Sequence, residues 1–273
     1  MSTSRDALAP LAALPGIDAA VASMRKTVDR VYGHRVMRRR STEVTAEAVL
    51  RGARASAALA GADWALEEVR RRTDFSSDAQ ARTMGAALRV TAEAGQLLPI
   101  WRQSPLRVLA RLHLVAASGA ADEEAVGRPR RAGEPVDEPG VPLPLPDAAE
   151  VSARLDGLAD VIVTGSSAPA LVTAAVVHGE LLELRPFGSY NGLIARAAER
   201  IVLVGSGLDP KSICPAEVGH AEEDADAYRR ALTGYAEGTP EGMAGWINHC
   251  GRAVELGARE STAVCEALQR GAA

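Results

Sequence analysis

Apolar residues recur every three or four positions along most of this chain, a spacing that predicts amphipathic helices. The first such stretch covers residues 17–36. Its apolar positions are Ile17, Ala20, Val21, Met24, Val28 and Val31. The basic run from His34 to Arg40 follows it, and we expect a solvated linker there, with an anion-binding patch as the alternative.

Side chains suited to N-terminal capping predict where later helices begin. Residues 77–80 (SDAQ) and 147–150 (DAAE) fit capping boxes, and prolines follow Ser104, Ser167 and Thr239 within two positions. Each of these sites therefore predicts a helix start.

A further helix is expected to begin after Thr42 and to run past residues 56–61 towards Arg70. In total the pattern predicts about ten helices and at most a short β-hairpin, which is an all-α fold. The scarcity of aromatic residues, 3% of the chain, favours helices packed through small side chains over a sheet. We expect three parts: residues 1–40 (N-terminal helix and basic linker), 41–238 (core) and 239–273 (C-terminal helix packed on the core).

The charge pattern narrows the choice of partners. The net charge is −4, and the basic residues are scattered rather than gathered on one element, so no nucleic-acid surface is expected. The longest uncharged run, residues 161–177, is too short and interrupted to span a membrane.

Neither a signal peptide nor a disulfide framework is expected. The N-terminus lacks a continuous apolar segment of signal-peptide length. Cys214, Cys250 and Cys265 are odd in number and have no metal-type spacing, which indicates reduced thiols in a cytoplasm.

Residues 184–196 (LRPFGSYNGLIAR) interrupt one apolar helix and open another. Asn191 and Gly192 tolerate the backbone of a tight turn, and the free N–H groups of the following helix would point into it. Such a turn favours a bound phosphate, because the backbone donors and the helix dipole both attract an anion.

The same stretch resembles the Fic-family motif HxFx(D/E)GNGRxxR, whose members usually transfer AMP from ATP to a hydroxyl of a target protein. Phe187, Asn191, Gly192 and Arg196 match it, and Pro186 is the family's usual residue after the histidine. The resemblance implies a phosphate- or nucleotide-binding set made of Pro186, Phe187, Gly188, Tyr190, Asn191, Gly192 and Arg196.

Four positions depart from this motif. Arg185 stands at the histidine position, Ser189 at the metal-binding acid, Tyr190 at the first glycine and Leu193 at the first arginine. A guanidinium has no acceptor and stays protonated, so Arg185 cannot serve as the base. A serine hydroxyl is a poor magnesium ligand.

An upstream segment resembles the family's inhibitory helix, (S/T)xxxE(G/N). Ser56 and Gly61 match, whereas Ala60 stands where the family has the glutamate. In relatives that glutamate pairs with the second arginine of the motif, here Arg196. Its loss means either that inhibition was removed from an active site or that an inactive site no longer needs it. The departures at positions 185 and 189 favour the second.

Three functions remain open. The first is a degenerate Fic-like protein without normal AMP transfer that still binds a nucleotide or phosphate at residues 185–196; no cofactor is certain, and ATP with magnesium applies only if activity survives. The second is an active transferase with another phosphate-containing donor, for which His178, Glu180 or Glu183 would supply the base.

The third function is non-enzymatic partner binding, with the proline-rich loop of residues 127–146 as the contact surface for a protein target. In the Fic family a β-hairpin flap in this region pairs with the target, but prolines lack the N–H that a ladder needs. His113, in the helix before this loop, is expected to be structural, with a substrate contact as the alternative. A homodimer is compatible with this function.

Overall fold

The computed structural model describes residues 6–120, 123–138 and 140–271, and nearly all of its regular structure is helical. The helices of these ranges are α1 (Ala9–Ala12), α2 (Ile17–Tyr32), α3 (Met37–Leu59), α4 (Leu66–Arg71), α5 (Ala79–Leu97), the 3₁₀ helix η1 (Leu98–Ile100), α6 (Pro105–Ala117), α7 (Ala148–Thr164), α8 (Ala170–Leu184), α9 (Asn191–Gly205), α10 (Ala216–Glu222), α11 (Ala225–Glu237) and α12 (Pro240–Arg270). The described residues contain no sheet, only an isolated parallel bridge between Asp137 and Ser189. The predicted all-α class is confirmed, and the additional helices are mostly short.

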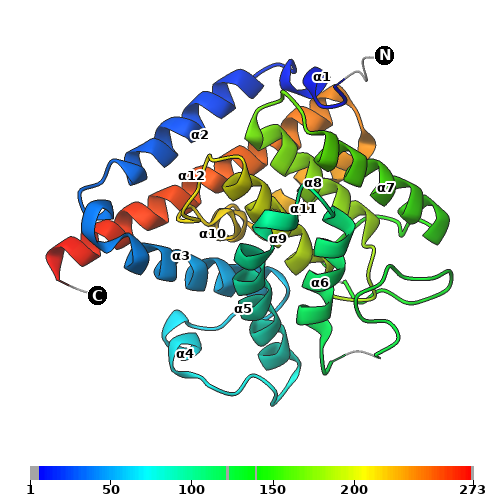
Figure 1. Ribbon diagram of the computed structural model, residues 1–273, viewed down its shortest axis with the longest axis horizontal. Helices are drawn as coiled ribbons and strands as arrows, with labels where there is room; N and C mark the ends of the chain where they lie inside the picture. Colours follow the sequence, from blue (N-terminus) through cyan, green and yellow to red (C-terminus); the bar gives the residue numbers. More distant parts are fainter. Residues whose placement is uncertain (1–5, 121–122, 139, 272–273) are drawn as a thin grey trace.

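Helix α9 is the centre of the bundle (Figure 1). Of its 15 residues, 13 are buried, because α8, α5, α6, α3 and α10 all pack against it. Three of these buried residues are charged: Arg196, Glu199 and Arg200. Buried charges need partners inside the protein, so the polar contacts of α9 mark a candidate functional site.

The long helix α12 crosses the molecule beside α2, and α10 and α11 pack on it (Figure 1). Small residues allow this close approach. A Cβ atom at Gly219 of α10 would overlap with the backbone of Ala253 on α12. The predominance of small apolar residues in the sequence thus corresponds to closely packed helices.

Side-chain caps form at the starts of α5, α7 and α12, with Asp78 rather than Ser77 capping α5, whereas no side chain caps α6 or α8. Asp78 and Asp147 each accept a bond of 2.8 Å from the N–H three residues ahead, and Thr239 accepts one of 3.0 Å in the same way. Helix α6 begins at Pro105, as the Ser-Pro pair predicts.

The basic linker is shorter than predicted. Helix α3 begins at Met37 rather than after Thr42, because Val36 and Met37 are buried and draw this segment onto the core. The backbone of Arg40 is non-helical and kinks α3 there, and its guanidinium donates to the Leu268 carbonyl at 2.8 Å.

The predicted continuous helix through residues 56–61 to Arg70 is wrong. Helix α3 ends at Leu59, and Gly61 takes a left-handed conformation with φ of +90°. The separate helix α4 follows, because left-handed backbone cannot continue a right-handed helix.

Within the described ranges, no helix has both the length and the apolarity needed to cross a membrane.

Candidate functional site

The turn between α8 and α9 is closed by its own side chains. Arg185 and Tyr190 at its two ends have left-handed backbones, with φ of 43° and 59°. The Asn191 side chain accepts a hydrogen bond from the Phe187 N–H and donates one to the Phe187 carbonyl, both 2.9 Å. Asn191 therefore holds the turn through its side chain.

His113 connects this turn to the loop of residues 127–146. Its ring stacks on Phe187 with centroids 4.4 Å apart, and its Nδ1 accepts from the Gly127 N–H at 3.0 Å. Burial lowers the pKa of His113 to about 4, so the imidazole is neutral at pH 7. These contacts are those of the predicted structural histidine.

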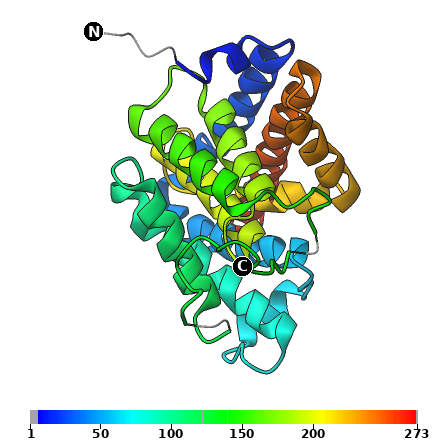
Figure 2. The ribbon, with the colours of Figure 1, turned by 90° about the vertical axis from the view of Figure 1, so that its right-hand side faces the viewer.

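The loop lies along the backbone of the turn. The Arg130 N–H donates to the Pro186 carbonyl at 2.7 Å, and the Asp137 N–H donates to the Gly188 carbonyl at 2.8 Å. Figure 2 shows this green loop on the face of the bundle turned towards the viewer. In its described residues the loop forms no hairpin, because its backbone N–H groups at Arg130 and Asp137 pair with the turn instead of with a second strand.

Arg185 anchors the same loop. Its guanidinium donates to the carbonyls of Leu143, at 3.0 Å, and Pro144, and only 5% of the residue is exposed. Burial lowers the pKa of Arg185, although Arg has no accessible neutral form near pH 7. At the motif's histidine position, the chain thus carries a side chain that fastens the loop.

The carboxylate of Glu138 occupies the anion position at the start of α9. A Cβ atom on Gly192 would lie only 2.9 Å from Glu138 Oε1. Burial raises the pKa of Glu138, against the opposing effects of the Arg196 charge and the N–H groups of Gly192 and Asn191. Oε2 is buried without a hydrogen-bond partner. The turn therefore receives an acidic side chain, and it comes from the chain itself.

The sequence alone did not identify Glu138. It lies 54 positions before Gly192 in an irregular loop, and no local pattern distinguishes it from the other acidic residues there. Only the docking of the loop on the turn brings the two together.

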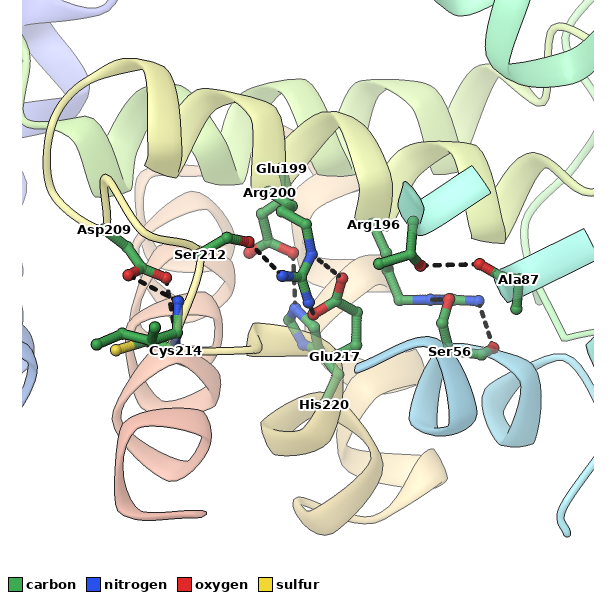
Figure 3. A network of polar contacts seen from close by, with 12 residues as sticks. Ser56, Ala87, Arg196, Glu199, Arg200, Asp209, Ser212, Cys214, Glu217 and His220 are labelled. Atoms are coloured by element: carbon green, nitrogen blue, oxygen red, sulfur yellow. Dashed lines mark hydrogen bonds and ion pairs between the residues drawn. The ribbon is translucent and has the colours of Figure 1, made fainter. Parts of the chain in front are cut away.

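Arg196 joins the site to α3. Its Nε donates to Ser56 Oγ at 2.8 Å and its Nη2 to the Ser56 carbonyl at 2.9 Å, as Figure 3 shows. The structure thus places Ser56 beside the second arginine of the motif. Ala60 and Gly61 are exposed at the end of the same segment.

A cleft of about 780 Å³ lies next to Glu138, within the size range of small-molecule sites. Its walls come from the end of α3, the start of α5, residues 189–190 of the turn, and α10 and α11. Arg82 and Arg229 line it together with the acidic residues Asp63, Asp137 and Glu138. Ala60, Gly61, Ser189 and Tyr190 form part of its wall.

The three candidate bases are held by other groups. His178 is fully buried and contacts Tyr228 and Glu199. Glu180 and Glu183 both bind Arg154, at 2.8 Å in each case.

No protein-family model and no curated protein sequence matches the chain. Solved structures do. A Fic family protein from Desulfovibrio desulfuricans G20 is 20% identical with a TM-score of 0.75, over 92% of this chain and 75% of that one. Fic-1 from C. elegans is 17% identical with a TM-score of 0.61, and the match covers 92% of this chain and 74% of Fic-1. A Fic domain containing signaling protein from Bacteroides thetaiotaomicron VPI-5482 is 13% identical with a TM-score of 0.65, over 90% and 98%. The likeness shows that the chain has the Fic-domain fold.

Proposed function

We propose that this Fic-fold protein does not transfer AMP and that the start of α9 is a binding site for a phosphate-bearing ligand, such as a nucleotide, which Glu138 closes. The observation that carries the proposal is the Glu138 carboxylate at the N–H groups of Asn191 and Gly192. A carboxylate and a phosphate oxygen seek the same donors, so the two compete for one position.

The absence of AMP transfer is supported by the side chains around the turn. Proton abstraction needs a group with a free acceptor and a suitable pKa. Arg185 has neither and is held by the Leu143 and Pro144 carbonyls. His178, Glu180 and Glu183 are each bound to other residues, which argues against the alternative of an active transferase using one of them as its base.

The residues of the turn do not suit a magnesium ion that bridges nucleotide phosphates. Hard carboxylate oxygens hold such an ion, but Ser189 offers a neutral hydroxyl at the corresponding position. We therefore propose that the phosphate binds without magnesium, through backbone N–H groups and through Arg196, Arg82 and Arg229.

Displacement of Glu138 has a consequence for the loop. Glu138 follows Asp137, whose N–H pairs with the Gly188 carbonyl. A ligand that expels the carboxylate removes one of the contacts that dock this loop on the turn. Binding of an anion in the site would thereby change the surface that the loop presents to a partner protein.

The test compares ATP, AMP and pyrophosphate binding by calorimetry in the wild type and in Glu138→Gln, which lacks the charge. Because the competing carboxylate is weakened, E138Q should bind at least one of these probes about tenfold more tightly, equivalent to ~1.4 kcal/mol. Glu134→Gln is the matched control, since Glu134 lies on the same loop but pairs with Arg128. It should bind as the wild type does.

Two results would contradict the proposal. One is the absence of binding of all three probes to both the wild type and E138Q. The other is transfer of label from ATP to proteins of a cell lysate, because the proposal excludes AMP transfer.

A further inference from the structure

Four potential metal ligands converge in the core below α9. They are His178 on α8, Glu199 on α9, His220 on α10 and Cys250 on α12, all of them buried, and their ligand atoms all lie within 4.8 Å of one another. Figure 3 shows Glu199 and His220 facing each other between α9 and α10. This cluster is separate from the turn at residues 185–190.

The inner atoms of the cluster are incompletely satisfied. Glu199 Oε2 lies 2.9 Å from both His178 Nδ1 and His220 Nε2. Glu199 Oε1 has no hydrogen-bond partner, and His178 Nδ1, although close to Oε2, is not oriented to form a hydrogen bond. Buried polar atoms without partners indicate an additional occupant, such as an ion or a water molecule.

Within the described ranges, no arginine forms an ion pair with Glu199. Its neighbour Arg200 forms a two-bond ion pair with Glu217, at 2.7 and 2.8 Å, and Arg196 donates to Ser56. A carboxylate in the interior needs a positive partner. A divalent cation between the carboxylate and the imidazoles would supply one.

The outer atoms of the imidazoles are fixed by further hydrogen-bonding groups. His178 Nε2 lies 2.7 Å from the Tyr228 hydroxyl, and His220 Nδ1 lies 3.1 Å from His249 Nε2. His249 Nδ1 in turn lies 3.2 Å from Glu223 Oε2. Metal-binding histidines typically have their second nitrogen held in this way.

The tautomers along this series favour a cation. If the inner His220 nitrogen binds a metal, its Nδ1–H donates to His249 Nε2, and the His249 Nδ1–H faces Glu223 Oε2 at 3.2 Å. Every contact then joins a donor to an acceptor. If His220 Nε2–H instead donates to Glu199, neutral His249 turns its Nδ1 lone pair towards Glu223 Oε2, which is repulsive while that carboxyl is ionised.

We propose that His178, Glu199, His220 and Cys250 form a structural zinc site. Two imidazole nitrogens, a carboxylate oxygen and a thiolate are donors that zinc accepts in four-coordinate sites. Four protein ligands leave no open position, so the ion would join four helices rather than catalyse a reaction. On binding, the Cys250 thiol releases its proton to solvent and its sulfur bonds to the metal.

A modest rearrangement is required. Zinc bonds of about 2.0–2.1 Å at tetrahedral angles separate nitrogen and oxygen ligands by roughly 3.3 Å. The present separations of 2.9 Å from Glu199 Oε2 therefore have to widen by about 0.4 Å.

The spacing of these residues explains why the sequence did not reveal them. Neighbouring members of the set are separated by at least 21 positions, unlike the short spacings of known zinc motifs. The cluster arises only when four helices pack together.

The experiment measures zinc content and cobalt(II) spectra of the full chain after chelator treatment and metal reloading. We expect one equivalent of zinc, and a near-ultraviolet thiolate-to-cobalt band together with visible bands of four-coordinate geometry. Cys250→Ser should lose the thiolate band and should lower zinc affinity by more than the ~10–100-fold typical of an outer-shell change. Cys265 is a buried cysteine on the same helix but outside the cluster, so Cys265→Ser should retain both the thiolate band and the zinc affinity.

Glu199→Gln provides a second variant with nearly unchanged shape, and it should also weaken zinc binding. Failure of the wild type to bind stoichiometric zinc or cobalt overturns the proposal whatever the variants do. A thiolate band that persists in folded C250S overturns it as well, because the metal would then bind at another cysteine.

Discussion

At the scale of single residues, two glutamates of the same loop illustrate how surroundings determine the behaviour of a carboxyl group. Glu138 is desolvated at the start of α9, and burial raises its pKa. Glu134 lies at the surface, where hydrogen bonds from Arg128 and the Arg131 N–H hold its pKa down to about 2. The same side chain thus has opposite pKa shifts within four positions of the sequence.

The two carboxyl groups predict opposite pH dependences of stability. A raised folded-state pKa means that the contribution of Glu138 is present below its ordinary pKa of about 4.5 and is lost as the pH rises through the folded value. The stability of E138Q relative to the wild type should therefore increase from pH 4.5 to pH 7. Urea denaturation across this range measures the difference.

Glu134→Gln serves as the control, because its effect on stability should have the opposite pH dependence. Because the pKa of Glu134 is lowered, its contribution is present above pH 4.5 and is lost as the pH falls towards 2. The difference between E134Q and the wild type should therefore shrink in acid. Parallel pH curves for E138Q and the wild type would contradict the burial of the Glu138 carboxyl.

At the scale of elements, arginine side chains of the turn and the loop donate the hydrogen bonds that dock the loop, where a β-strand would use backbone N–H groups. Arg185 reaches the carbonyls of Leu143 and Pro144, and Arg130 reaches those of Arg185 and Pro146. Prolines keep their acceptors although they have no N–H. A proline-rich loop can therefore be docked by side-chain donors where a strand cannot form.

Removing one of these anchors should loosen the loop without unfolding the bundle. In Arg185→Ala the Leu143 and Pro144 carbonyls lose their donor, so we expect faster hydrogen exchange in peptides covering residues 127–146 and unchanged protection in α9. Mass spectrometry of exchange measures both regions. Arg131→Ala removes an exposed arginine of the same loop and should leave exchange near wild type; equal exchange in R185A and the wild type would contradict the anchoring role.

At the scale of the whole molecule, close helix contacts set the arrangement that brings the buried groups together. Gly219 on α10 lies directly against the Ala253 backbone on α12, and the neighbouring residues His220 and Cys250 belong to the proposed zinc site. The distance between these two helices therefore determines whether that site can form.

A single methyl group at this contact should be strongly destabilising. Gly219→Ala would place its Cβ on the Ala253 backbone, so we expect a loss of at least ~2 kcal/mol in the free energy of unfolding. Gly245→Ala on α12 is the matched control, because nothing lies within 4 Å of its Cβ position, and it should be neutral or stabilising by up to ~1 kcal/mol. Equal unfolding midpoints of the two variants in denaturant would contradict this contact.

The sequence by itself determined features that depend on neighbours along the chain. Helical periodicity predicted the all-α class, and capping residues predicted the starts of α5, α7 and α12. The Pro, Gly and Asn residues of the turn predicted the break between α8 and α9, although Arg185 and Tyr190, not Asn191 and Gly192, take the left-handed backbone. Half of the Fic motif was sufficient to indicate the fold that the solved structures share. These signals are local, because caps, turns and periodicity act over a few residues.

Only the tertiary structure decided which residues from distant parts of the sequence come into contact. Glu138 reaches the start of α9 because the loop docks there, and His178, Glu199, His220 and Cys250 meet because four helices pack closely. Arg185 became a loop anchor by the same docking. Contacts between distant segments depend on how whole surfaces fit together, and no local pattern in a single sequence encodes that fit.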